Sequence, residues 1–91
     1  MRMQRKKMLI RTEKGKYLFS DKFHELFIDK DYDGHSYVIM ARWSGAMEEE
    51  LNSLCSYMTQ GEAEKALEYL VYALSEGNQK IYRMTEEYIP D

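Results

Sequence analysis

The chain has 91 residues, a formal net charge of −3 and a single cysteine, Cys55. This length predicts one small domain, and one cysteine excludes an internal disulfide and favours a reducing, cytoplasmic setting. The longest uninterrupted apolar stretch, residues 37–41, is too short to span a bilayer.

Charge is unevenly distributed along the chain. Residues 1–7 carry four basic side chains, which leaves nine basic and sixteen acidic side chains, a net charge of −7, in the remainder. Nucleic-acid-binding proteins usually present a basic face, so the acidic body predicts no direct binding to nucleic acid. We expect residues 1–7 to be a disordered basic terminus, residues 8–84 to form the domain and residues 85–91 to be an acidic tail. Translation that starts at Met8 instead of Met1 is compatible with this division.

Three segments in the first half of the chain have the composition of strands. Residues 8–19 contain two short extended runs around Lys14 and Gly15, which is typical of a hairpin. Residues 23–29 and 37–43 are rich in aromatic and branched side chains and predict two longer strands.

The segment between these longer strands, DKDYDGHSY at residues 29–37, fits the opening pattern of a calcium-binding loop. Such a loop needs a bidentate carboxylate at its twelfth position and a helix on each side. The twelfth position from Asp29 is Met40, and the flanking residues have strand composition. We therefore predict a solvated type I′ hairpin turn centred on Asp33 and Gly34, with no metal site.

A two-residue turn at these positions determines which residues of the two strands face each other. It pairs Ile28 with Ile39, Leu26 with Ala41 and His24 with Trp43 on one face, and Phe27 with Met40 and Glu25 with Arg42 on the other. Both faces carry apolar residues, so we expect a central hairpin that is partly covered on each side.

Residues 44–57 are ambiguous. Met47, Leu51, Leu54 and Met58 recur at helical spacing, but a loop through residues 48–50 followed by a strand ending near Tyr57 fits equally. We favour the loop and the strand.

A helix follows. Thr59 and Glu62 form a capping box, which marks its first turn, and Gly77 is placed to end it. An apolar stripe at helical spacing comprises Ala63, Ala66, Leu67, Leu70, Val71 and Leu74. Residues 79–84 predict a last short strand. The fold class is therefore α+β, an antiparallel sheet of four to five strands with one long helix packed on one face.

Three stretches follow a recurring pattern: Ile10-Arg11-Thr12, the helix start from Thr59 to Leu67, and the run from Tyr82 to Glu87. In them the chain resembles small phage or prophage proteins of low-GC Gram-positive bacteria. These begin with an I-R-[ST] strand and continue through a strand meander and a T-x-x-E-x-A helix to a Y-x-M-P-E ending. Thr85 stands where that pattern has proline. The resemblance implies the fold and a phage setting, and implies no activity.

Residue types that could support catalysis or metal binding do not form a recognisable site. Ser20, Asp21 and His24 lie close together on an extended run and lack a nucleophile-elbow pattern. His24 and His35 have no partner ligands at zinc spacing. The sequence therefore predicts that the protein is not an enzyme and needs no cofactor.

Aromatic content is high for a small core, with eight tyrosines, three phenylalanines and one tryptophan. Tyrosine is enriched at interfaces because it supplies a large contact area at low entropic cost. Partial burial at the edges of the sheet is the competing explanation. Our candidates for binding are Arg42, Trp43, Tyr69, Tyr72, Tyr82 and Arg83, with Tyr17, Tyr37 and Tyr57 as further contact residues.

These features predict a non-catalytic binding protein of phage or mobile-element type that acts by protein–protein contact. Its partner is a second copy in a homodimer, a host protein that it inhibits, such as a defence component, or both. Electrostatic imitation of DNA by the acidic body is a variant of this function. The alternative is a homo-oligomer that sequesters a nucleotide-like ligand, with Arg42–Trp43 and Tyr82–Arg83 as its pairs of cation and aromatic ring.

Overall fold

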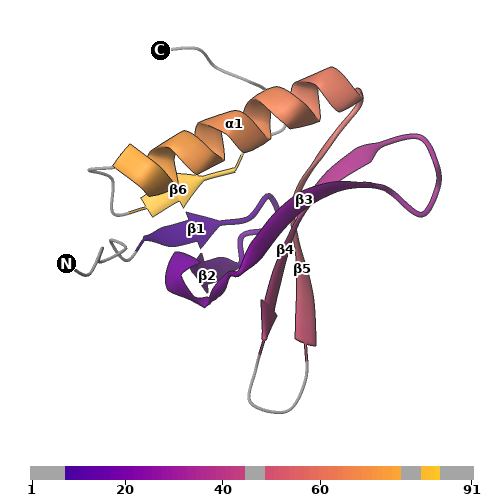
Figure 1. Ribbon diagram of the computed structural model, residues 1–91. Helices are drawn as coiled ribbons and strands as arrows, with labels where there is room; N and C mark the ends of the chain where they lie inside the picture. The colour runs from indigo at the N-terminus through magenta and orange to yellow at the C-terminus, as the bar shows by residue number, and fades with distance from the viewer. Residues whose placement is uncertain (1–7, 45–48, 77–80, 85–91) are drawn as a thin grey trace.

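The computed structural model describes residues 8–44, 49–76 and 81–84 (Figure 1). In chain order the elements are β1 (Leu9–Arg11), β2 (Tyr17–Phe19), the 3-10 turn η1 (Ser20–Lys22), β3 (Glu25–Lys30), β4 (Tyr37–Ser44), β5 (Glu49–Tyr57), α1 (Gln60–Glu76) and β6 (Ile81–Arg83). The predicted disordered terminus, the acidic tail and the helix end at Gly77 lie outside the described residues.

The strands form two three-stranded sheets, so the α+β class is confirmed but the single sheet of four to five strands is wrong. The first sheet has the order β2–β1–β6, and β1 is antiparallel to β2 but parallel to β6. The second sheet is the antiparallel meander β3–β4–β5. The sheets meet where the turn after β1 contacts β5: the amide of Glu13 donates to the carbonyl of Leu54 at 2.9 Å.

The hairpin of β1 and β2 forms where Lys14 and Gly15 predicted it. The amide of Gly15 donates to the carbonyl of Thr12 at 2.9 Å, and the amide of Thr12 donates to the carbonyl of Lys16 at 2.8 Å. Gly15 has a φ of 83°, which a residue with a Cβ rarely adopts. The turn brings Ile10 opposite Leu18, and both side chains enter the core.

The hairpin of β3 and β4 has the predicted register, from Glu25 opposite Arg42 to Ile28 opposite Ile39. The predicted type I′ turn is wrong. The amide of Gly34 donates to the carbonyl of Asp31 at 2.8 Å, so Tyr32 and Asp33 are the central turn residues, and only Gly34 has a positive φ, 75°. The register survives because the observed loop is centred on the same point of the chain as the predicted turn.

The ambiguous segment is a strand, as favoured, and it ends at Tyr57. The strand begins earlier than expected, because Glu49 and Glu50 already belong to β5 and do not form a loop. Its pairing with β4 shifts between Ile39 opposite Cys55 and Met40 opposite Ser53. Leu54 is the extra residue of this β-bulge, which turns its carbonyl towards Glu13.

Helix α1 begins as the capping box predicts. The hydroxyl of Thr59 accepts a hydrogen bond from the amide of Glu62 at 3.1 Å, and its carbonyl accepts the amide of Ala63 at 3.2 Å. The helix has 17 residues, so the prediction of one long helix overstates its length. Figure 1 shows α1 running alongside β6 and above β1, and it also contacts β3, β4 and β5.

The apolar stripe predicted for α1 is correct at its centre and wrong at one edge. Ala63, Ala66 and Leu70 are buried, and Ala73, which the stripe omits, is buried with them. Val71, in contrast, is 47 % exposed. The buried core that α1 covers combines both sheets and comprises Ile10, Leu18, Phe23, Ile39, Ala41, Leu54, Cys55, Tyr57, Ala63, Ala66, Leu70 and Met84.

Candidate functional site

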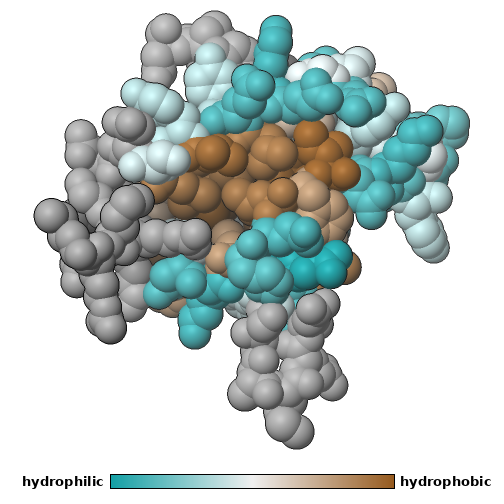
Figure 2. Space-filling view, viewed as in Figure 1, coloured by the Kyte–Doolittle hydropathy of each residue, from teal (hydrophilic) through white to brown (hydrophobic). Residues whose placement is uncertain are grey.

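One side of α1 leaves apolar side chains at the surface. The hollow along this side is lined by Glu64, Leu67, Glu68, Val71, Tyr72 and Ser75, and we call these six residues the α1 patch. Val71 is 47 % exposed and Tyr72 is 66 % exposed, while Leu67 is partly buried against the core. Figure 2 shows a band of hydrophobic surface just below α1 with hydrophilic residues on both sides of it.

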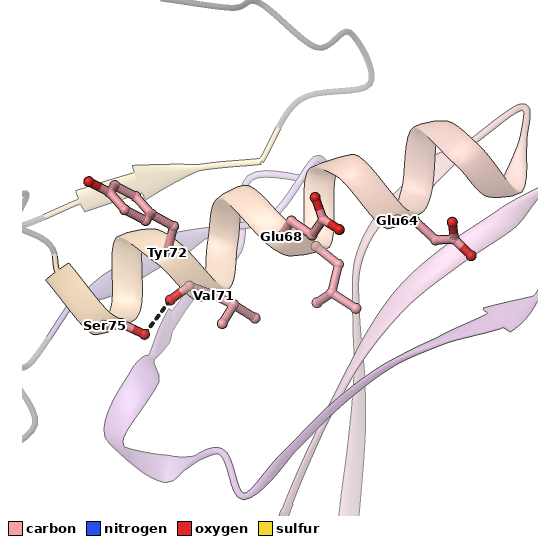
Figure 3. Close-up of a pocket in the computed structure, with 6 residues that line it drawn as sticks. Glu64, Glu68, Val71, Tyr72 and Ser75 are labelled. Carbon is pink, nitrogen blue, oxygen red and sulfur yellow. Dashed lines mark hydrogen bonds between the residues drawn. The ribbon is translucent and has the colours of Figure 1, made fainter.

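The spacing of these residues explains the patch. Leu67 and Val71 are four residues apart, so they stack along one ridge of the helix. Figure 3 shows Val71 pointing below the helix, with Tyr72 on its upper side and Glu64 and Glu68 along its length. The hydroxyl of Ser75 donates to the carbonyl of Val71 at 2.8 Å. The patch therefore combines an apolar ridge, two carboxylates and two hydroxyl groups.

The predicted pair Arg42 and Trp43 is engaged within the second sheet. The Nε of Arg42 lies 3.0 Å from the Oε1 of Glu25, and its guanidinium lies 5.4 Å from the ring centroid of Phe27. The indole of Trp43 donates to a carboxylate oxygen of Glu50 at 2.6 Å. The Arg42 charge is thus already balanced by a carboxylate, which weakens its case as an anion-binding group.

The remaining predicted binding residues do not meet at one place. Tyr72 belongs to the α1 patch, whereas Tyr69 is 45 % exposed on the same helix and lies near the half-buried Tyr82 of β6. Burial, and then the neighbouring Tyr69, raise the pKa of Tyr82 above its ordinary value. Arg83, one residue further along β6, is exposed. The six candidates are therefore divided among the β4 strand, α1 and the first sheet.

A polar cluster that the sequence does not reveal joins the two sheets. The thiol of Cys55 donates to the Oε2 of Glu13 at 3.6 Å, and the amide of Ser56 donates to the Oε1 of Glu13 at 3.1 Å. Burial, and then the adjoining Cys55, raise the pKa of the Tyr57 hydroxyl far above its ordinary value. Because Glu13 is 42 or more residues from the other members of the cluster, no local pattern signals it.

The aspartates of the β3–β4 turn accept hydrogen bonds from other residues of the same turn. The carboxylate of Asp31 accepts the amide of Tyr32 at 2.8 Å and the hydroxyl of Ser36 at 3.1 Å. The carboxylate of Asp33 accepts the amide of His35 at 2.8 Å. Within the described parts of the chain, no three His, Cys, Asp or Glu side chains are placed to hold a metal ion.

Among the described residues, no helix is long and apolar enough to cross a membrane. No protein-family model, curated protein or solved structure matches this chain.

Proposed function

We propose that this chain is a non-catalytic binding protein of phage or mobile-element type that acts by protein–protein contact through the α1 patch. The observation that carries the proposal is the exposure of Val71 and Tyr72 beside Leu67 on one helix face. Exposed apolar patches on small proteins commonly mark interaction sites. The phage setting rests on the resemblance of the sequence pattern.

The occupant that fits the patch best is a second copy of the chain. A two-fold axis requires one surface to be complementary to itself. If two α1 helices cross antiparallel with the axis between Leu67 and Val71, each Leu67 meets Val71 of the second copy. In this register Glu64 lies within one residue of Ser75 of that copy, and Glu68 lies within two residues of its Tyr72. Leu67 then meets an apolar side chain and the Glu68 carboxylate approaches the Tyr72 hydroxyl, whereas the Ser75 hydroxyl already donates to the carbonyl of Val71 within its own helix.

Self-association of this kind is weak. Interfaces of stable dimers bury on the order of 800 Å² per partner, which six residues on one helix face reach only in part. We therefore expect a dissociation constant on the order of micromolar. A foreign protein with the same complementary groups is the alternative occupant, and it would compete with the second copy for the same patch.

The sequestration of a nucleotide-like ligand between subunits has less support. Its proposed cation Arg42 already lies 3.0 Å from a carboxylate oxygen of Glu25. Tyr82 is half-buried in the core while Arg83 is exposed, so that pair does not form one pocket wall.

Disulfide trapping tests the proposed pairing. Glu64→Cys and Ser75→Cys variants, mixed under mild oxidation, should form a disulfide-linked dimer faster than either variant alone, because position 64 of one copy lies within one residue of position 75 of the other. Tyr32→Cys, at a 99 % exposed position in the β3–β4 turn, is the control for random collision. Native Cys55 is buried and should not react. Equal rates in all samples would contradict the proposed pairing.

A further inference from the structure

The β2–β1–β6 sheet has one face towards the core and one face away from it. Ile10 and Leu18, at the centres of β1 and β2, are buried in the core together with residues of α1. Successive side chains of a strand point to opposite faces, so the neighbours of these two residues point away from the core. We call the following six residues the outer face: Leu9, Arg11, Tyr17, Phe19, Ile81 and Arg83.

One row of the outer face places two arginines side by side. Arg11 on β1 lies opposite Tyr17 on one side and Arg83 on the other. Like charges directly opposite each other destabilise a sheet. Among the described residues, the ion pair joins Arg42 to Glu25, and no carboxylate pairs with Arg11 or Arg83. This row therefore carries the two positive charges of Arg11 and Arg83, which an anion from outside the protein would balance.

The second row is apolar. Leu9 lies between Phe19 and Ile81. The exposed fractions are 47 % for Phe19 and 43 % for Ile81, and Tyr17 in the arginine row is 52 % exposed. An aromatic ring is thus exposed in each row of the sheet face that carries Arg11 and Arg83.

We propose that the outer face binds single-stranded nucleic acid. Guanidinium groups match the geometry of phosphate oxygens and bind them bidentately. Exposed aromatic rings on a sheet stack with unpaired bases, whatever the base.

This proposal departs from the expectation based on overall charge. Helix α1 carries four of the sixteen acidic side chains and one lysine. Because α1 packs on the core side of the sheet, the outer face points away from it. The net charge of −3 describes the whole chain and does not give the charge of one face. The proposal does not depend on the α1 patch or on dimerisation.

Fluorescence anisotropy of the full chain tests the site. The probe is a labelled oligothymidylate of about 12 nucleotides, titrated at salt concentrations from about 50 to 200 mM. The Arg11→Gln/Arg83→Gln double variant should weaken binding by about tenfold or more and reduce the slope of log K against log salt by about 1.4. Tyr17→Ala should weaken binding by roughly fivefold or more.

A Lys30→Gln/Lys65→Gln double variant removes the same charge from exposed positions on β3 and α1. It should change the affinity less than about twofold, because these side chains lie outside the outer face. Thermal unfolding establishes that each variant is folded. The Arg11→Lys/Arg83→Lys double variant keeps both charges, so it should retain the salt slope but bind less tightly.

Three results would overturn the proposal. The first is the absence of salt-dependent binding by the unmodified chain. The second is an equal loss of affinity in the outer-face and control double variants. The third is binding to a polyglutamate peptide or to vesicles of anionic lipid as tight as to the oligothymidylate, because these probes offer carboxylates or phosphates without bases.

Discussion

The amide of Glu13 donates a hydrogen bond to the carbonyl of Leu54, the bulged residue of β5, at 2.9 Å. This bond joins the first sheet to the second. The carboxylate of Glu13 strengthens the junction by accepting the amide of Ser56 at 3.1 Å. The turn after β1 thereby closes part of the edge of β5, an edge that would otherwise present unpaired backbone groups.

Removal of the Glu13 side chain should loosen this junction. A hydrogen bond to a charged acceptor is lost, so Glu13→Ala should lower the free energy of unfolding by about 1 kcal/mol. Lys14→Ala, at the next position of the same turn, is exposed and should have a much smaller effect. Denaturant unfolding of both variants measures the difference. Equal stability of the two variants would contradict a role for the Glu13 carboxylate.

Two glycines should respond in opposite directions to alanine. Gly34 has a φ of 75°, so Gly34→Ala should destabilise the β3–β4 turn by about 1 kcal/mol. Gly61 lies in the first turn of α1, and a Cβ there meets no atom within 4 Å. Gly61→Ala should therefore stabilise the protein, by up to about 1 kcal/mol. Thermal unfolding of both variants in the same buffer compares their stability. A loss of stability from Gly61→Ala as large as that from Gly34→Ala would contradict the difference in backbone conformation between the two glycines.

Stability should fall at alkaline pH because two tyrosines have raised pKa values. Burial raises the pKa of both Tyr57 and Tyr82 above 10.0, so the folded state keeps protons that the unfolded state releases. Their contribution to the free energy of unfolding is complete below about pH 10. Above this pH, the contribution of each tyrosine decreases by about 1.4 kcal/mol per pH unit.

Thermal unfolding between about pH 8 and 11 measures this decrease. Tyr57→Phe should make it shallower, because one buried hydroxyl no longer titrates. Tyr32→Phe, at a 99 % exposed position, should leave it unchanged. An identical pH dependence in the two variants would show that Tyr57 titrates as an exposed tyrosine does.

Millimolar calcium should leave the melting temperature unchanged. The carboxylates of Asp31 and Asp33 already accept hydrogen bonds from the amides of Tyr32 and His35 in the β3–β4 turn. A calcium loop also needs a distant bidentate carboxylate, and position 40 is a methionine. A saturable rise in melting temperature with calcium would contradict the assignment of this segment as a turn.

Local patterns predicted the local parts of this fold. The position of the turn at Asp33 and Gly34 was sufficient for the β3–β4 register, although the predicted turn type was wrong. Thr59 was sufficient for the start of α1, because each signal involves neighbours in the chain. The two-sheet division was not predictable, since it depends on Glu13 meeting Leu54 and on β6 pairing in parallel with β1. These contacts join segments that lie far apart in the chain, so no local pattern signals them.

The surfaces were predictable only in part for the same reason. A wide apolar stripe on a helix does not disclose which edge the sheet leaves open, so Val71 was assigned to the core. Tyr72 and Arg83 were selected by residue type, and the structure places them on different surfaces. The neighbourhood of Arg11 and Arg83 arises from strand pairing between residues 72 positions apart.

Light scattering on the purified chain tests most directly whether the α1 patch is a protein-contact surface. We expect a mass that rises from 10.9 kDa towards twice that value across the micromolar range. Val71→Glu should abolish the rise without changing the melting temperature, because Val71 is half exposed, while Tyr32→Glu should leave it intact. A mass that stays at 10.9 kDa throughout this range, or a dimer that Val71→Glu leaves unchanged, would contradict the proposed self-association through the α1 patch.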